Sequence, residues 1–88
     1  MDEQAIIEKM EQAIKAMDLS LMVRRAVQAA AWFKELGLET PGHATSLDTI
    51  RLKFADVMIA PEASDDYLIA EMRQCVTVEL AKMRHAMQ

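Results

Sequence analysis

Cysteine, glycine, proline and aromatic residues are scarce in this 88-residue chain, which has one cysteine, two glycines, two prolines and 5% aromatic residues. The single cysteine, Cys75, rules out an intrachain disulfide and favours a reducing, intracellular environment. Two glycines are too few for a glycine-rich phosphate-binding loop. No hydrophobic run approaches the ~20 residues of a membrane-spanning helix, and acids stand near the start, where a signal peptide carries bases. We therefore expect a cytoplasmic protein with no membrane association.

Clusters of basic residues and catalytic groupings are also missing. The net charge is −4 and the ten Lys and Arg residues are dispersed, which disfavours nucleic acid as a partner. His43 and His85 have no second His or Cys at ligand spacing, so no metal site is expected. No Ser, Cys or Lys has a recognisable base beside it in a motif. The sequence thus predicts a protein that is not an enzyme and binds no cofactor.

Helical periodicity, by contrast, fills nearly the whole chain. The residues are 52% hydrophobic, mostly Ala, Leu, Ile, Val and eight Met, and the chain is too short for two independent cores. We predict an all-α fold for a single domain over residues 1–88: a four-helix, mostly antiparallel bundle-like domain with a long C-terminal helix. Start and stop signals place the helices at about residues 2–17, 21–36, 46–60 and 64–87.

Two boundaries rest on particular residues. Gly37 is expected at the C′ position of the second helix, where a positive φ is needed. Pro41 and Gly42 fit the central positions of a type II turn, and Thr45 or Ser46 then caps the third helix. The break between the first two helices is soft, so that they are expected either as separate helices or as one kinked helix.

The first and last predicted helices carry long apolar seams. The helix at residues 21–36 is apolar over roughly 220° of its circumference and is therefore expected at the centre. We expect that one small core cannot cover both seams, and a homodimer is the simplest way to bury them. Aromatic and Met side chains at such seams are typical of binding surfaces. The candidate interaction residues are Trp32, Arg51, Ile69, Met72, Val76 and Met83.

The favoured function is a non-catalytic intracellular protein–protein interaction module, a small regulator or adaptor that acts as a homodimer on a larger protein partner. Glu35, Gly37, Gly42 and Arg51 have a spacing similar to that in phage anti-sigma proteins, which are also acidic, all-α chains of similar length. The resemblance covers about a quarter of the chain.

The alternative function is DNA binding by a helix-turn-helix-like regulator. The stretch from Gly37 to Pro41 resembles the Gly-Ile-x-Thr-Pro stretch in the DNA-binding part of large serine recombinases. In that interpretation the helix at residues 46–60 reads a groove through Thr49, Arg51 and Lys53.

A further alternative is a carrier protein. The sequence from Ser46 to Asp48 resembles the Asp-Ser-Leu motif of acyl carrier proteins, although Thr45 stands where those proteins have aspartate. The resemblance implies that Ser46 carries phosphopantetheine, whereas capping of a helix is the ordinary role of such a serine.

Overall fold

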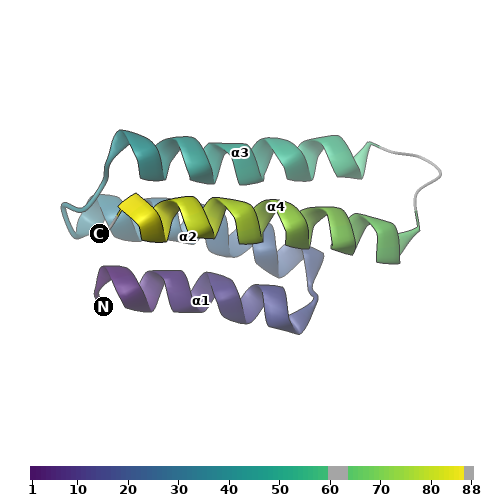
Figure 1. Cartoon of the computed structure of the whole chain (residues 1–88), viewed down its shortest axis with the longest axis horizontal. Coiled ribbons are helices and arrows are strands. Elements are labelled where there is room, and N and C mark those ends of the chain that lie inside the picture. Colours follow the sequence, from purple (N-terminus) through teal and green to yellow (C-terminus); the bar gives the residue numbers. More distant parts are fainter. Residues whose placement is uncertain (60–63, 87–88) are drawn as a thin grey trace.

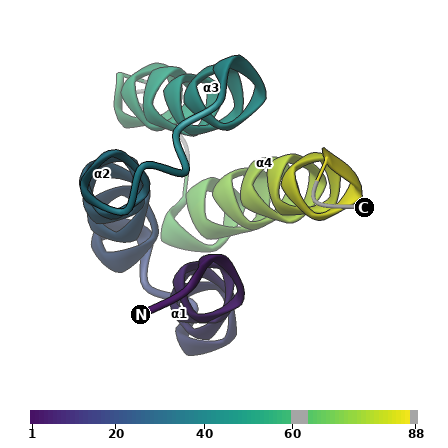
Figure 2. The same cartoon turned by 90° about the vertical axis from the view of Figure 1, so that its left-hand side faces the viewer.

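The four helices run alternately in opposite directions in the computed structural model, which describes residues 1–59 and 64–86 (Figure 1). Seen from one end, α4 lies opposite α2 and beside both α3 and α1 (Figure 2). The predicted all-α bundle with a long C-terminal helix is confirmed. Within the described residues, no helix is both long enough and apolar enough to cross a membrane. The helices are α1 (Glu3–Ala16), α2 (Leu19–Glu35), α3 (Pro41–Met58) and α4 (Asp65–Ala86).

Local backbone conformations separate the first three helices. Met17 ends α1 in the left-handed region (φ 55°), and the Asp18 side chain then accepts a hydrogen bond of 2.9 Å from the backbone N–H of Leu21. The two helices are therefore distinct rather than one kinked helix. At the end of α2, Gly37 has the predicted positive φ (68°), and the Leu38 N–H donates to the Phe33 carbonyl at 2.8 Å. This pattern is a Schellman motif, which satisfies the last carbonyls of the helix.

The prediction for the start of the third helix is wrong. Thr40 is the N-cap of α3, since its hydroxyl oxygen accepts a 3.0 Å hydrogen bond from the His43 N–H. Pro41 occupies the first helical turn, where its missing N–H costs nothing and its fixed φ suits a helix. The expected type II turn at Pro41 and Gly42 is thus part of the helix, and Ser46 lies inside α3 instead of capping it. The expected helix ends at residues 60 and 87 lie outside the described residues.

The apolar seams of α1 and α4 are covered within the chain, so the prediction of uncovered seams is wrong. Met72, Val76 and Met83 of α4 are at most 1% exposed, and so are Ile7 and Met10 of α1. The physical reason is that α4 packs against all three other helices, which together enclose its apolar face. Homodimerisation remains a prediction, but the surfaces that motivated it belong to the core.

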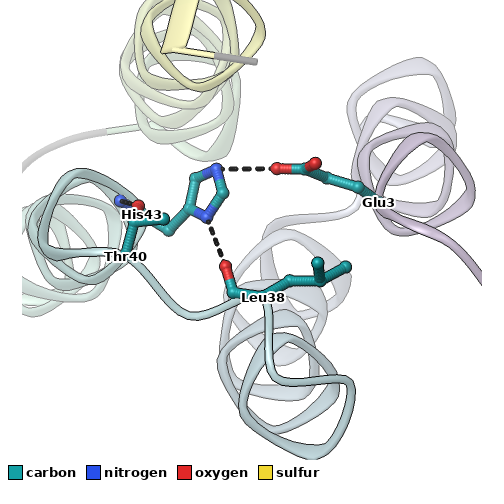
Figure 3. A network of polar contacts seen from close by, with 4 residues as sticks. All are labelled: Glu3, Leu38, Thr40 and His43. Atoms are coloured by element: carbon teal, nitrogen blue, oxygen red, sulfur yellow. Dashed lines mark hydrogen bonds and ion pairs between the residues drawn. The ribbon is translucent and has the colours of Figure 1, made fainter.

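A buried histidine joins the start of α3 to the start of α1 (Figure 3). The His43 ring is 3% exposed and stacks on Phe33, with 4.4 Å between ring centroids and 14° between planes. Its Nδ1 lies 3.3 Å from the Leu38 carbonyl oxygen, and its Nε2 lies 3.1 Å from Glu3 Oε1 without meeting hydrogen-bond geometry. The Leu38 carbonyl and the Glu3 carboxyl group thus face the two ring nitrogens of His43, which links the start of α1 to the start of α3.

Truncation of Met72 tests its place in the core. We expect Met72→Ala to lower the free energy of unfolding by about 2 to 5 kcal/mol, because it leaves a cavity among α1, α2 and α3. Val78→Ala, on the exposed side of the same helix, is the control and should change it by about 0.5 kcal/mol or less. Urea denaturation measures both values. A Met72→Ala protein as stable as the control would contradict this packing.

The contact between His43 and Glu3 gives a second stability test. Glu3→Ala removes the carboxyl group that faces the buried Nε2, and we expect a loss of about 1 kcal/mol in the free energy of unfolding. Glu8→Ala removes an exposed acid from the same helix and serves as the matched control. Equal effects in urea denaturation would show that Glu3 does not hold His43.

Candidate functional site

A groove runs between α3 and α4 because α3 presents small side chains to its neighbour. Thr45 and Ser46 are neighbours that follow Gly42 by three and four residues and precede Thr49 by four and three, so all four lie on one side of α3. The space that they leave forms two hollows, of about 380 Å³ and about 440 Å³. We call this surface the α3/α4 groove. Its principal residues are Thr45, Thr49 and Lys53 of α3 and Val78, Glu79 and Lys82 of α4.

The two hollows meet at Glu79. One extends toward Lys53, the other extends toward Pro41, and both are lined by Thr49, Glu79 and Lys82. Glu79 is only 3% exposed, which is rare for an acidic residue without strong partners. The Lys82 ammonium donates a 3.3 Å hydrogen bond to Glu79 Oε1; it also lies 3.2 Å from Oε2, which accepts no hydrogen bond. The carboxylate at the junction therefore has fewer donors than it can accept.

The threonine hydroxyls in the groove are left as acceptors. Thr45 donates its hydroxyl hydrogen to the Pro41 carbonyl at 2.8 Å, and Thr49 donates to the Thr45 carbonyl, also at 2.8 Å. A hydroxyl has one hydrogen and two lone pairs. Each threonine oxygen can thus still accept a hydrogen bond but has no hydrogen left to give.

A second ion pair closes the other end of the groove. Lys53 Nζ lies 2.9 Å from Glu71 Oε2, and this hydrogen bond and the charge of Glu71 raise the pKa of the Lys53 ammonium. Lys53 and Glu71 neutralise each other across the two helices. Among the described groove residues, Lys82 is therefore the cation that pairs with Glu79.

Cys75 lies half-buried in the wall of the hollow that extends toward Lys53. Burial raises the pKa of its thiol, and the negative charge of Glu79 raises it further, whereas Lys53 and Lys82 lower it. A protonated thiol is a weak nucleophile. Cys75 thus contributes a small, weakly polar surface to the groove rather than a reactive group.

One exposed apolar side chain lies in the groove wall, and two more lie one helical turn from residues that line it. Val78 lines the hollow toward Lys53 and is 48% exposed. Leu52 is 66% exposed and follows Thr49 by one helical turn, and Tyr67, also exposed, precedes Glu71 by one turn. A polar floor with apolar side chains beside it suits a polypeptide segment that buries its own apolar side chains around a polar contact.

The predicted interaction residues do not gather on one surface. Trp32 and Ile69 are half-buried and pack against the core, and the Lys9 ammonium lies 6.0 Å from the centre of the Trp32 ring. Arg51 is exposed and pairs with Asp48 at 3.2 Å. The remaining three, Met72, Val76 and Met83, are core residues.

The predicted DNA-reading residues also fail to share a face. Thr49 and Lys53 are four residues apart and both line the α3/α4 groove, whereas Arg51 lies on the opposite side of the helix. Lys53 is held by Glu71 and Arg51 by Asp48, so both cations already have acidic partners. Nothing in this arrangement supports groove reading by α3.

Ser46 is 5% exposed and lies in the second turn of α3, facing α4. The resemblance to acyl carrier proteins requires an exposed serine that opens a helix. The position of Ser46 therefore gives that alternative no support.

Glu79 was missed in the sequence, although a signal was present. It lies three residues after Val76 and four before Met83, so it interrupts the apolar stripe of α4. A charged residue at such a position is normally paired or functional. The residues of α3 that line the same groove are not visible in the sequence, because Thr45 and Thr49 have the pattern of ordinary helix residues.

No family model matches this chain, and no curated protein or solved structure is significantly similar to it.

The rate of Cys75 alkylation tests the electrostatics of the groove. Because the thiol pKa is raised, we expect slow reaction with iodoacetamide at neutral pH and a rise only at a higher pH than for an exposed cysteine. Glu79→Gln removes a charge that raises this pKa, so the rate at a fixed pH should increase. Glu8→Gln is the control, since Glu8 is an exposed acid on α1 and is not among the causes of the shift. Equal rates in the two variants would show that Glu79 does not lie near the thiol.

Proposed function

We propose that this chain is a non-catalytic interaction module, a small regulator or adaptor that binds a segment of a larger protein in the α3/α4 groove. The observation that carries the proposal is the groove itself, which combines a buried, under-satisfied carboxylate with the exposed apolar side chain of Val78 in its wall. A stable monomer has no internal use for such a combination.

The composition of the groove favours a protein partner over a nucleic acid. Its cations, Lys53 and Lys82, are both next to carboxylates, at 2.9 Å from Glu71 and 3.2 Å from Glu79. Phosphate binding requires cations that are free to replace counterions. A partner that buries Val78 and Leu52 gains free energy from the apolar area removed from water.

The groove has no arrangement for covalent catalysis. Among the residues that line it, the thiol of Cys75 is held protonated, and the threonine hydroxyls donate to backbone carbonyls instead of to a general base. Non-covalent binding of a protein partner is therefore the function that this geometry supports best. A free, half-buried thiol also suits a cytoplasmic location, where thiols stay reduced.

Affinity capture from the native host tests the proposal with matched surface variants. The baits are the wild-type chain, Val78→Lys on the groove rim, and Val27→Lys on α2, which does not line the groove. Val27 is 53% exposed and Val78 is 48% exposed, so the two substitutions place a charge on equally accessible sites. We expect a partner that the wild type and Val27→Lys recover and that Val78→Lys loses.

Two other results would contradict the proposal. If no protein depends on Val78 for its recovery, the groove is not a docking surface for a partner. If the bait recovers only further copies of this same chain through Val78, the groove is a homodimer interface and the larger partner is excluded.

A further inference from the structure

The carboxylate of Glu79 lacks the hydrogen bonds that its burial requires. A carboxylate can accept roughly four hydrogen bonds, and Glu79 accepts one, from Lys82, among the described residues. A buried charge is tolerated when it is both paired and hydrogen-bonded. Oε2 therefore marks a place where a donor from outside the chain would be favoured.

Lys82 is a weak partner that a ligand can displace. It is three residues from Glu79 on the same helix, and its side chain is 65% exposed. Ion pairs of exposed lysines contribute little, because water and salt screen them and the flexible side chain loses entropy in holding one geometry. When a stronger donor arrives, the Lys82 ammonium can move into solvent at little cost.

Several of the hydrogen-bonding side chains around this point can only accept, whereas Ser46 and Gln74, which also line the two hollows, can donate as well. Thr45 and Thr49 of α3 have already donated their hydroxyl hydrogens to backbone carbonyls, and Glu79 of α4 offers carboxylate oxygens. A ligand that satisfies this set needs several donors and a positive charge. Guanidinium has five N–H donors in a planar fork and pairs with carboxylates through two parallel bonds, whereas an ammonium has three donors around one point.

The hollow toward Pro41 can receive the rest of such a side chain. Its volume is about 440 Å³, and Pro41, Gly42 and Ala86 form apolar parts of its wall. The methylene stem of an arginine packs well on such a surface while its charged end reaches a polar group.

We propose that the junction of the two hollows at Glu79 binds a guanidinium group, supplied by an arginine side chain of the protein partner. That the arginine belongs to a protein partner rests on the proposed function. That the site binds a guanidinium group is argued only from the hydrogen-bond acceptors that line it. Glu79 makes the charged contact, and the Thr45 and Thr49 oxygens accept the remaining N–H groups.

Titration of the full-length, ¹⁵N-labelled chain with blocked amino acids tests the site by NMR. The probes are N-acetyl-arginine methylamide, the neutral N-acetyl-citrulline methylamide of almost the same shape, and N-acetyl-lysine methylamide. We expect the arginine probe to shift the amide signals of Thr45, Thr49 and Glu79. The citrulline probe should bind about tenfold more weakly, since it cannot make a charge-assisted hydrogen bond, and the lysine probe should lie between them.

Three variants assign the effect to Glu79. Glu79→Gln should weaken binding of the arginine probe about tenfold, and Glu8→Gln, which changes an exposed acid on α1 outside the groove, should leave it unchanged. Lys82→Ala removes the competing cation and should leave binding equal or tighter. If Glu79→Gln does not fold, the comparison of arginine with citrulline on the wild type still decides.

Equal binding of arginine and citrulline, or shifts confined to another surface, would overturn the guanidinium site. If a partner depends on Val78 but the groove shows no preference for arginine, this inference fails and the proposed function stands. Arginine-selective binding without any Val78-dependent partner overturns the proposed function and leaves the guanidinium site established.

Discussion

A carboxylate lies where the bundle would ordinarily place an apolar side chain. Glu79 shares the inward side of α4 with Val76 and Met83 and is almost as deeply buried, yet one of its oxygens has no hydrogen-bond donor. The ion pair with Lys82, which is largely exposed, offsets part of the free-energy cost of removing this carboxylate from water. Natural proteins are rarely at their stability optimum, and the recurrent cost of stabilising them is lost function. Small side chains of α3 leave open space beside Glu79, and its charge adds to the effect of burial in raising the pKa of the Cys75 thiol.

Elsewhere in the bundle the helices bury their apolar faces against one another, and this limits where a binding surface can lie. α4 is enclosed by α1, α2 and α3, and the seams that looked available in the sequence are closed by this packing. His43 adds a polar link between the ends of α1 and α3, where it is buried against Phe33. These contacts build the scaffold. The α3/α4 groove differs from them because its buried carboxylate, which lacks a hydrogen bond at Oε2, lies beside open space.

Local signals in the sequence were sufficient for the fold, whereas the site depended on contacts between helices. Capping residues and Gly37 located most helix boundaries, and the start of α3 was misplaced because Pro41 was interpreted as a turn residue although it also suits a first helical turn. Periodicity identified the apolar faces of α1 and α4 correctly. It did not show that one chain could cover them both, because that depends on how three helices surround a fourth.

The groove could not be predicted from sequence patterns either, because it also depends on contacts between helices. Thr45 and Thr49 have no signature that marks them as acceptors, and their role follows from the carbonyls to which they donate. Lys53 looked free in the sequence and is held by Glu71 of another helix. Glu79 alone could have been found, from its place within an apolar stripe.

The stability of a Glu79→Met variant tests the central claim most directly. Methionine has a similar length and no charge, and the Lys82 left behind is mostly exposed. If the Glu79 carboxylate is under-satisfied, its replacement should raise the free energy of unfolding in urea by about 1 kcal/mol or more. A loss of stability of that size would instead show that the carboxylate is fully compensated within the bundle, and the groove would then have no need of an external donor.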